Sequence, residues 1–104
     1  MARRVIWAPR ARYDIHLARE YISRDSPAAA RKFVRAVIQA GRSLAEFSER
    51  GRVVPELGEP GVREVFVSRY RVIYEVFEDR IAMLRVIHGR RDLFAAWGRE
   101  HSEE

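Results

Sequence analysis

Cysteine is absent from the sequence, lysine occurs once, and histidine occurs three times among 104 residues. Without cysteine the chain can form no disulfide, no thiolate nucleophile and no cysteine-ligated metal site. His16 falls on the flank of an expected helix and His101 in the C-terminal tail, so neither suggests a metal site. We therefore expect no metal and no cofactor.

Long apolar runs are also missing. The longest, LFAAW at residues 93–97, is shorter than the roughly 7 to 15 residues of a signal-peptide core and the about 20 of a membrane span. We therefore expect a cytoplasmic protein. With 47% hydrophobic and 34% charged residues, the composition is typical of one globular domain over residues 1–104, with 92–104 as a tail.

The charge is basic and unevenly distributed. Arginine supplies 19 of the 20 basic residues, and the formal net charge is +5. Residues 1–52 carry 12 basic and 5 acidic side chains, whereas residues 53–104 carry 8 and 10. A basic surface attracts polyanions, either nucleic acid or an acidic protein segment. A GC-rich genome also favours arginine codons, and we take this as the main cause of the preference for arginine over lysine.

The first half of the sequence predicts a strand and two helices. RVIW at residues 4–7 is rich in residues that favour strands, and Pro9 suits the first turn of a helix. Apolar residues then recur at helical spacing over residues 9–24. A second helix is expected to begin at Pro27, with Ser26 as its N-cap, and to stop near Gly51. The connection is short, so the two helices should pack antiparallel.

The second half predicts a loop and an antiparallel meander. Residues 48–62 contain three glycines and two prolines, which is typical of a functional or disordered loop. Strands are expected at residues 62–68, 70–77 and 81–88. The fold class is therefore α+β with two layers and the order βααβββ. An N-terminal helical hairpin covers an antiparallel sheet, and a short C-terminal tail or helix follows.

The last hairpin has a register that can be argued. A three-residue loop at residues 78–80 would place Tyr74 opposite Leu84 and Val72 opposite Val86, which makes one face apolar. A two-residue loop would oppose Val72 to Arg85 and bury a charge, so we favour the longer loop. The other face would then carry arginines, with Glu75 able to pair with Arg85.

Several segments together resemble the RelE/ParE toxins of type II toxin–antitoxin modules over about residues 5–93. The order and spacing of these segments carry the resemblance. They are WAPRARYDI (7–15), YISRDSPAAARKFV (21–34), GRVVPEL (51–57), REVFVSRYRVIYEV (63–76) and LRVIHGRRD (84–92).

The resemblance implies a small toxin neutralised by a cognate antitoxin, ParD-like or RelB-like, whose C-terminal segment wraps the toxin. Operator DNA would be bound through the antitoxin. The resemblance also implies one of two activities on the same fold, because RelE-like members cleave mRNA in the ribosomal A site and ParE-like members poison DNA gyrase.

The nuclease branch places its functional residues on particular positions of this chain. Ribonuclease chemistry needs a base, an acid and cations on the phosphate. By motif, these positions are Glu56, Arg71 and His88, with Arg63 as a second arginine. This sequence departs from the branch at Gly89, where nuclease members have a tyrosine next to or near the histidine.

HGRRD at residues 88–92 instead resembles the ending of the last strand in ParE-like toxins. We therefore expect a toxin that inhibits gyrase by binding, with growth inhibition and plasmid stabilisation as the biological role. A ribosome-dependent mRNA endonuclease and an inactive family member that binds antitoxin remain as alternatives. The expected target-binding residues are Arg71, Arg85, Arg90 and Arg91.

Antitoxin binding is expected at an apolar stripe on the first helix and at the arginine-bearing face of the sheet. The residues are Tyr13, Leu17, Tyr21, Arg71 and Arg85. Each has a plainer interpretation: the stripe could be core, the arginines could pair with Glu75, and His88 could be a polar strand end. Glu56 could likewise be a surface carboxylate.

Overall fold

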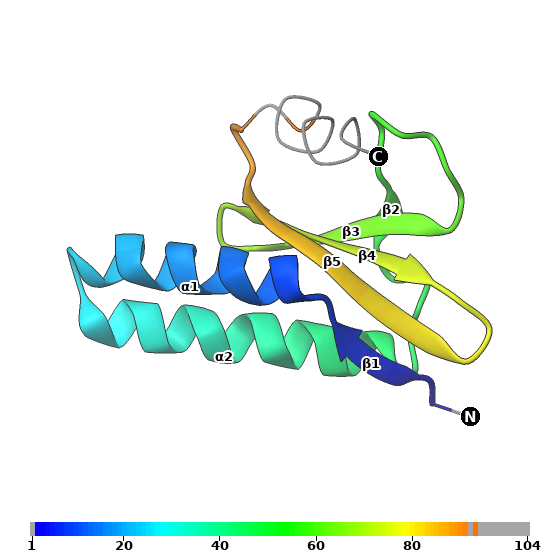
Figure 1. Ribbon diagram of the computed structural model, residues 1–104, viewed down its shortest axis with the longest axis horizontal. Coiled ribbons are helices and arrows are strands. Elements are labelled where there is room, and N and C mark those ends of the chain that lie inside the picture. The colour runs from blue at the N-terminus through cyan, green and yellow to red at the C-terminus, as the bar shows by residue number, and fades with distance from the viewer. Residues whose placement is uncertain (1, 92, 94–104) are drawn as a thin grey trace.

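The computed structural model describes residues 2–91 and 93. Two helices lie side by side next to a twisted sheet (Figure 1). In chain order the elements are β1 (Arg4–Trp7), α1 (Pro9–Ser23), α2 (Pro27–Leu44), β2 (Arg52–Val53), β3 (Val62–Val67), β4 (Tyr70–Val76) and β5 (Arg80–His88). This confirms the α+β class and the helical hairpin. No helix in the described part of the chain has the length and apolar character to cross a membrane.

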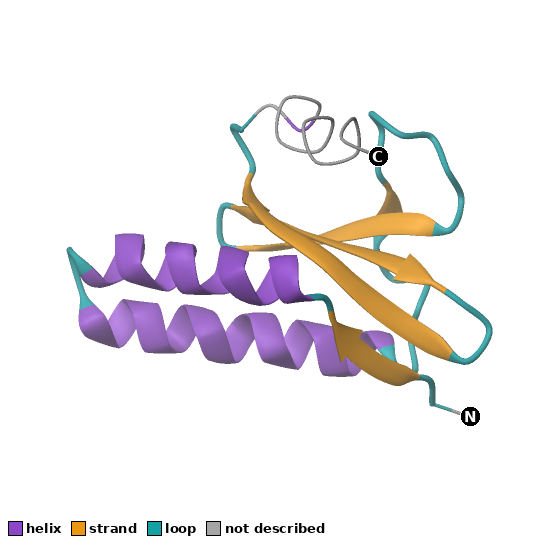
Figure 2. Ribbon diagram, viewed as in Figure 1, coloured by secondary structure: helices purple, strands orange, loops and turns teal. Residues whose placement is uncertain are grey.

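The sheet has five strands in the order β1-β5-β4-β3-β2 (Figure 2). Strands β3, β4 and β5 form the expected antiparallel meander. Strand β1 joins the sheet parallel to β5, after a crossover through both helices. Strand β2, which was not predicted, is a two-residue pairing with β3 inside the expected loop.

The second helix begins as predicted and ends earlier than expected. The Ser26 side chain accepts a hydrogen bond from the Ala29 amide at 3.1 Å, which caps the helix. The helix ends at Leu44 rather than near Gly51, and Phe47 is exposed. The chain turns here because the Tyr74 hydroxyl holds the next segment, donating to the Ser48 carbonyl and accepting from the Gly51 amide.

The predicted register of the β4–β5 hairpin is confirmed at the open end of the hairpin and is wrong near the turn. Val72 lies opposite Val86 as expected, but Tyr74 lies opposite Met83 rather than Leu84. The loop is the shorter one, because Phe77 and Arg80 are already hydrogen bonded. A bulge at Leu84 then shifts the register by one residue. The bulge therefore reconciles a tight turn with an apolar inner face.

Hydrophobic residues pack on both faces of the sheet. The inner core lies between the sheet and the helices and contains Phe33, Val37, Leu44, Val72 and Met83. A smaller cluster on the outer face contains Val54, Val62, Ile73, Ile87 and Leu93. The outer face was expected to be partly open, and the loop after β2 and Leu93 cover part of it.

Candidate functional site

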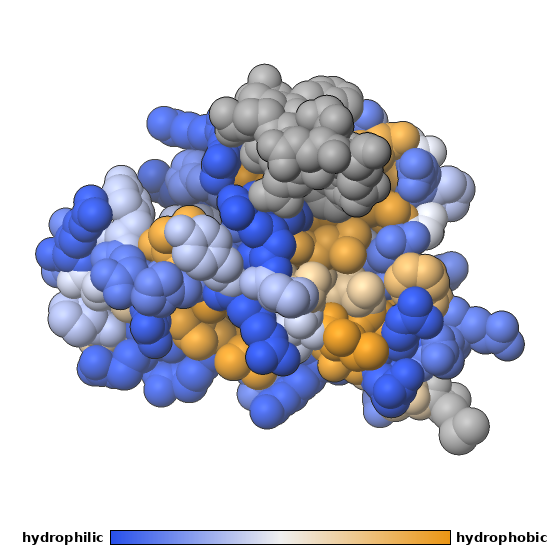
Figure 3. Space-filling view, viewed as in Figure 1, coloured by the Kyte–Doolittle hydropathy of each residue, from blue (hydrophilic) through white to orange (hydrophobic). Residues whose placement is uncertain are grey.

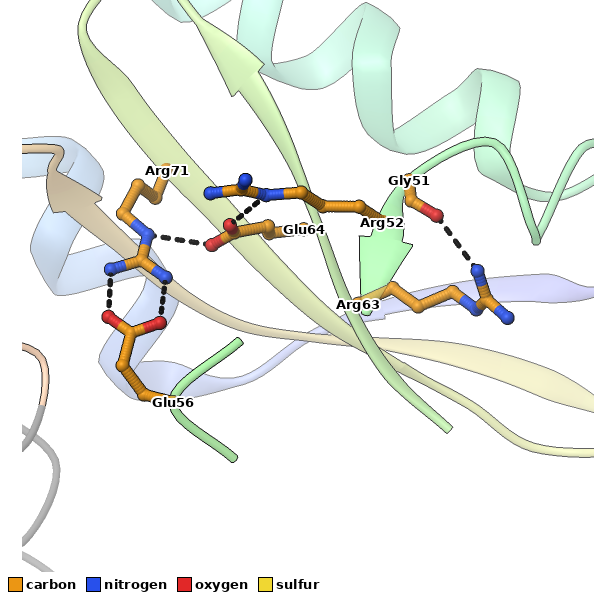
Figure 4. A network of polar contacts seen from close by, with 6 residues as sticks. All are labelled: Gly51, Arg52, Glu56, Arg63, Glu64 and Arg71. Atoms are coloured by element: carbon orange, nitrogen blue, oxygen red, sulfur yellow. Dashed lines mark hydrogen bonds and ion pairs between the residues drawn. The ribbon is translucent and has the colours of Figure 1, made fainter. Parts of the chain in front are cut away.

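A network of four charged residues lies on the outer face of the sheet (Figure 4). Arg71, on β4, donates two hydrogen bonds to the Glu56 carboxylate at 2.6 and 2.8 Å. Its Nε donates to Glu64 of β3 at 2.6 Å, and Arg52 of β2 donates to the other Glu64 oxygen at 2.7 Å. Two arginines and two carboxylates therefore neutralise one another and tie the loop after β2 to the sheet.

The pairing shifts the proton affinities of the two partners in opposite directions, and both shifts favour the charged forms. Hydrogen bonds from Arg71 hold the pKa of the Glu56 carboxyl below its ordinary value, and the same bonds raise the pKa of Arg71. Glu56 is therefore charged at neutral pH, and Arg71 already holds carboxylates. A lowered pKa makes Glu56 a weaker base than an ordinary glutamate.

Arg63 does not join this network. It precedes Glu64 on β3, so its side chain starts from the opposite face of the sheet. Its guanidinium donates to the Gly51 carbonyl at 2.9 Å. This contact has a structural role, because it fixes the turn before β2.

Arg85 lies at the edge of β5 beyond the residues that pair with β1. Its Nε donates to Asp14 of α1 at 2.8 Å, and the same carboxylate oxygen accepts the Val86 amide at 2.9 Å. The Asp14 carboxylate thus accepts the hydrogen bond from the Val86 amide that a carbonyl of a neighbouring strand would otherwise accept. The expected Arg85–Glu75 pair is wrong: Arg85 is paired with Asp14, 71 residues away in sequence.

Burial overturns another expectation about these two arginines. The side chains of Arg71 and Arg85 are 7% and 4% exposed. The expectation that they line an open, arginine-bearing surface is wrong, because each is held by carboxylates inside the fold. Neither guanidinium presents an accessible binding surface in this conformation.

His88 ends β5 on the inner face, as expected at the margin of the apolar register. Its ring meets the Tyr70 ring edge-on at 5.2 Å between centroids, and Tyr70 in turn contacts Phe33 of α2. The Arg90 amide donates to His88 Nδ1 at 3.2 Å, so the neutral ring carries its proton on Nε2. His88 and Tyr70 also line a cleft of about 650 Å³, together with Tyr21, Lys32 and Arg69.

The four residues implied by the nuclease branch therefore do not meet. Tyr70 and Arg71 are consecutive on β4 and point to opposite faces, and His88 lies opposite Tyr70. Glu56 and Arg71 are paired on the outer face, whereas His88 and Arg63 lie on the inner side. The arrangement does not bring an acid, a base and a cation to one point.

The stripe on α1 is accessible. Tyr13, Leu17 and Tyr21 are 51%, 42% and 64% exposed, so the interpretation of these residues as core is wrong. The Arg10 guanidinium lies over the Tyr13 ring and that of Arg24 over the Tyr21 ring, at 5.3 and 5.9 Å. The stripe thus combines aromatic and cationic groups on one helix face.

Arg90 and Arg91 are exposed after β5. The chain is anchored just before them, because the Gly89 amide donates to the Arg69 carbonyl at 2.7 Å. A Cβ on Gly89 would lie 3.1 Å from that carbonyl oxygen, so the close approach favours glycine. This places exposed arginines from the β3–β4 turn and from the end of β5 at one end of the sheet.

Sequence reasoning missed three structural side chains, namely Asp14, Glu64 and Tyr70. Asp14 stands on an expected helix among apolar neighbours, and Glu64 falls on the outer face of a strand, which are weak signals for buried carboxylates. The register placing Val72 opposite Val86 does imply that Tyr70 lies opposite His88, so that pair could have been found.

Within residues 2–91 and 93, no group of three carboxylate or histidine side chains is arranged to hold a metal ion. Leu93 packs in the outer hydrophobic cluster. The predicted C-terminal tail or helix at residues 92 and 94–104, with His101, lies outside the described residues.

Residues 5–93 match the model of a family described as the ParE toxin of the type II toxin–antitoxin system, parDE. The chain belongs to this family and to the RelE/ParE toxin superfamily. It is the toxin of a type II toxin–antitoxin module.

The two named relatives are both called RelE toxins, and the similar solved structures come from a ParDE and a RelBE system. The toxin is 36% identical to Toxin RelE2 of Caulobacter vibrioides over 88 residues, covering 84% of this chain and 96% of the relative. Toxin RelE3 of the same organism is 29% identical and covers 77% and 87%. A chain of the chromosomal ParDE system of P. aeruginosa has the same fold, with a TM-score of 0.68 and 21% identity over 84% of this chain and 96% of that one.

A chain of the RelBE2 toxin–antitoxin complex of Mycobacterium tuberculosis also shares the fold. Its TM-score is 0.57 and its sequence identity 22%, over 85% of this chain and 99% of that chain. The fold is therefore common to structures named after both branches, and the choice of target must be argued from the residues.

Proposed function

We propose that the toxin acts by binding DNA gyrase rather than by cleaving RNA. The observation that carries this proposal is the separation of Glu56 and Arg71 from His88 on opposite faces of the sheet. A ribonuclease needs its acid, base and cations around a single phosphate. Here Glu56 and Arg71 are hydrogen bonded to each other rather than available to a phosphate, so binding is the simpler activity for the toxin.

The proposed gyrase contact is the exposed end of the sheet at Arg90 and Arg91. These side chains follow the anchored Gly89 and form no ion pair with any described residue. Arg71 and Arg85 serve this surface indirectly, by holding the outer face and the edge of β5 in place. Gyrase works on DNA in the cytoplasm, which is where we place the toxin.

Neutralisation is proposed to occur at the α1 stripe and the neighbouring cleft. Tyr13, Leu17 and Tyr21 expose a row of large apolar groups flanked by arginines, which suits an amphipathic antitoxin segment with acidic side chains. Purification of the toxin as a lone monomer after expression of its whole operon would contradict the proposal that such an antitoxin binds it.

Purified toxin added to two reconstituted reactions tests the target. We expect it to inhibit gyrase supercoiling or to trap cleaved DNA, and to leave mRNA on programmed ribosomes intact. Cleavage of mRNA at the A site without any effect on gyrase would reject the proposal.

One observation favours the ribonuclease as a second candidate. Tyr70 lies beside His88 across the hairpin, and Lys32 and Arg69 line the same cleft. This supplies an aromatic ring beside the histidine, although residue 89 is glycine. In that case the site would be the inner cleft, without Glu56 and Arg71.

A further inference from the structure

Helix α2 carries charge of one sign. Among its 18 residues, Arg31, Lys32, Arg35 and Arg42 are basic and none is acidic. All four side chains are exposed. None forms an ion pair with another residue in the described ranges, 2–91 and 93.

Arg31, Arg35 and Arg42 lie on the side of α2 that faces away from the sheet, and Lys32 lies at the margin of this side, where it also lines the cleft beside Tyr70. At about 100° per residue, Arg31, Arg35 and Arg42 lie within roughly 40° of one another, and Lys32 lies about 60° beyond Arg35. The buried residues of α2, which include Phe33, Val37 and Leu44, occupy the opposite side. In the space-filling view, hydrophilic side chains line the lower edge of the molecule, where α2 lies in Figure 1 (Figure 3).

This arrangement costs helix stability. Arg31 and Arg35 are four residues apart, and like charges at this spacing destabilise a helix by about 0.2 to 0.5 kcal/mol. No contact of these four side chains within the described structure offsets that cost. A partner outside the chain that carries closely spaced negative charges would offset it.

We propose that the exposed face of α2, defined by Arg31, Lys32, Arg35 and Arg42, binds the phosphate backbone of duplex DNA. The row extends over about 16 Å, given a rise of 1.5 Å per residue, which spans several phosphates of a duplex. Binding of this kind is electrostatic and independent of sequence.

Other polyanions fit this face less well. Proteins that bind single strands stack bases on exposed aromatic rings, and the aromatic residue of α2, Phe33, is buried. Helices that lie on membranes insert a broad apolar face, whereas that face of α2 packs on the sheet. The choice of DNA over RNA rests on the proposed function, because gyrase acts on DNA.

Arg31, Arg35 and Arg42 lie outside the surfaces already described, whereas Lys32 also lines the cleft next to α1. Arg90 and Arg91 follow β5 at the end of the sheet, and the antitoxin stripe is on α1. DNA could therefore be held by α2 while the target or the antitoxin occupies its own surface. The toxin would then contribute its own contact to DNA in the gyrase complex or beside an operator-bound antitoxin.

The test measures binding of the purified full-length toxin to a labelled 20-base-pair DNA duplex over a series of salt concentrations. Four phosphate contacts predict a log–log slope of about −3.6 for the association constant. In Arg31→Gln/Arg35→Gln the slope should fall in magnitude by about 1.8, with affinity lowered roughly 10- to 100-fold at 0.1 M salt.

Arg4→Gln/Arg80→Gln is the matched control. It removes the same charge from two arginines of the sheet that already pair with Asp79. We expect a slope within about 0.5 of wild type, which is well below the change for the helix pair. An equal loss of slope in both double variants would show a general charge effect and overturn the proposal.

Three further ligands define the class: a single-stranded 20-mer, a 20-base-pair RNA duplex, and vesicles containing phosphatidylserine. Equal or tighter binding to any of these would overturn the assignment to duplex DNA. Gyrase supercoiling is measured separately. Unchanged DNA affinity in Arg31→Gln/Arg35→Gln rejects this inference alone, and a lack of gyrase inhibition by wild type rejects the proposed function alone.

Discussion

The arginines of the sheet and those of helix α2 are surrounded very differently. Arg71 and Arg85 are buried, and each donates to carboxylates that come from distant parts of the chain. Arg31, Arg35 and Arg42 are exposed and have no carboxylate partner in the described structure. Arginine thus stabilises the fold where carboxylates surround it, and it is available to bind a partner where they do not.

The difference bears directly on how arginine-rich toxins are interpreted. An arginine at a motif position is a candidate phosphate ligand, but a neutralised and buried guanidinium mainly holds the fold. Here Arg71 matches a family motif and is paired, whereas the arginines of α2 match no catalytic motif and are available. Measurements of stability should therefore respond to the first set, and measurements of polyanion binding to the second.

The largest effect on stability is expected for Asp14→Ala. This change removes a carboxylate that accepts from both Arg85 and the Val86 amide in a buried setting. Loss of one member of a buried ion pair costs about 3 to 5 kcal/mol. Urea denaturation followed by circular dichroism measures this, and a loss below about 1 kcal/mol would show that Arg85 does not depend on Asp14.

A smaller effect with a distinct pH dependence is expected for Glu56→Gln. Its carboxylate is partly exposed, so we expect a loss of about 1 to 2 kcal/mol at pH 7 from the bonds to Arg71. The pKa of Glu56 is lowered in the folded state, so its charged form stabilises the protein above the ordinary value of 4.5. That contribution is lost as the pH falls below 4.5 and through the folded pKa.

The difference in unfolding free energy between wild type and Glu56→Gln should therefore shrink as the pH is lowered from 7 to 3. Urea titrations at several pH values measure it. A difference that stays constant over this range would mean that the charge of Glu56 does not stabilise the fold.

The smallest effect on stability is expected for Arg31→Gln/Arg35→Gln. Exposed side chains without a structural partner change stability by no more than about 0.5 kcal/mol, and here the removal of repulsion could raise it. A thermal melt compared with wild type provides the measurement. A loss above about 1 kcal/mol would show that these arginines hold the fold and would remove the contrast with the sheet.

The parts of the fold that follow from local patterns could be predicted from the sequence. Helical spacing of apolar residues and the Ser26 cap gave the hairpin, and alternation with short connections gave the meander. Strand β2 has two residues, which is too short for any periodic signal. The bulge at Leu84 could not be predicted, because it arises only where a tight two-residue turn and an apolar inner face must both be formed by the same strand.

The candidate site was harder to predict than the fold. Which residues carry charge is visible in the sequence, but which carboxylate neutralises which arginine is not. Asp14 and Arg85 are 71 residues apart, and Glu56 reaches Arg71 from a loop without regular structure. Alternation along β4 did place Tyr70 and Arg71 on opposite faces, and this separation carries the functional argument.

The most direct test of the central claim compares the toxicity of His88→Gln with that of Arg90→Ala/Arg91→Ala in growing cells. Circular dichroism of the purified variants establishes that each is folded. If the toxin acts by binding, folded His88→Gln should remain toxic and the arginine double variant should lose toxicity. If folded His88→Gln is instead nontoxic while the double variant remains toxic, His88 is a catalytic acid and the account is contradicted.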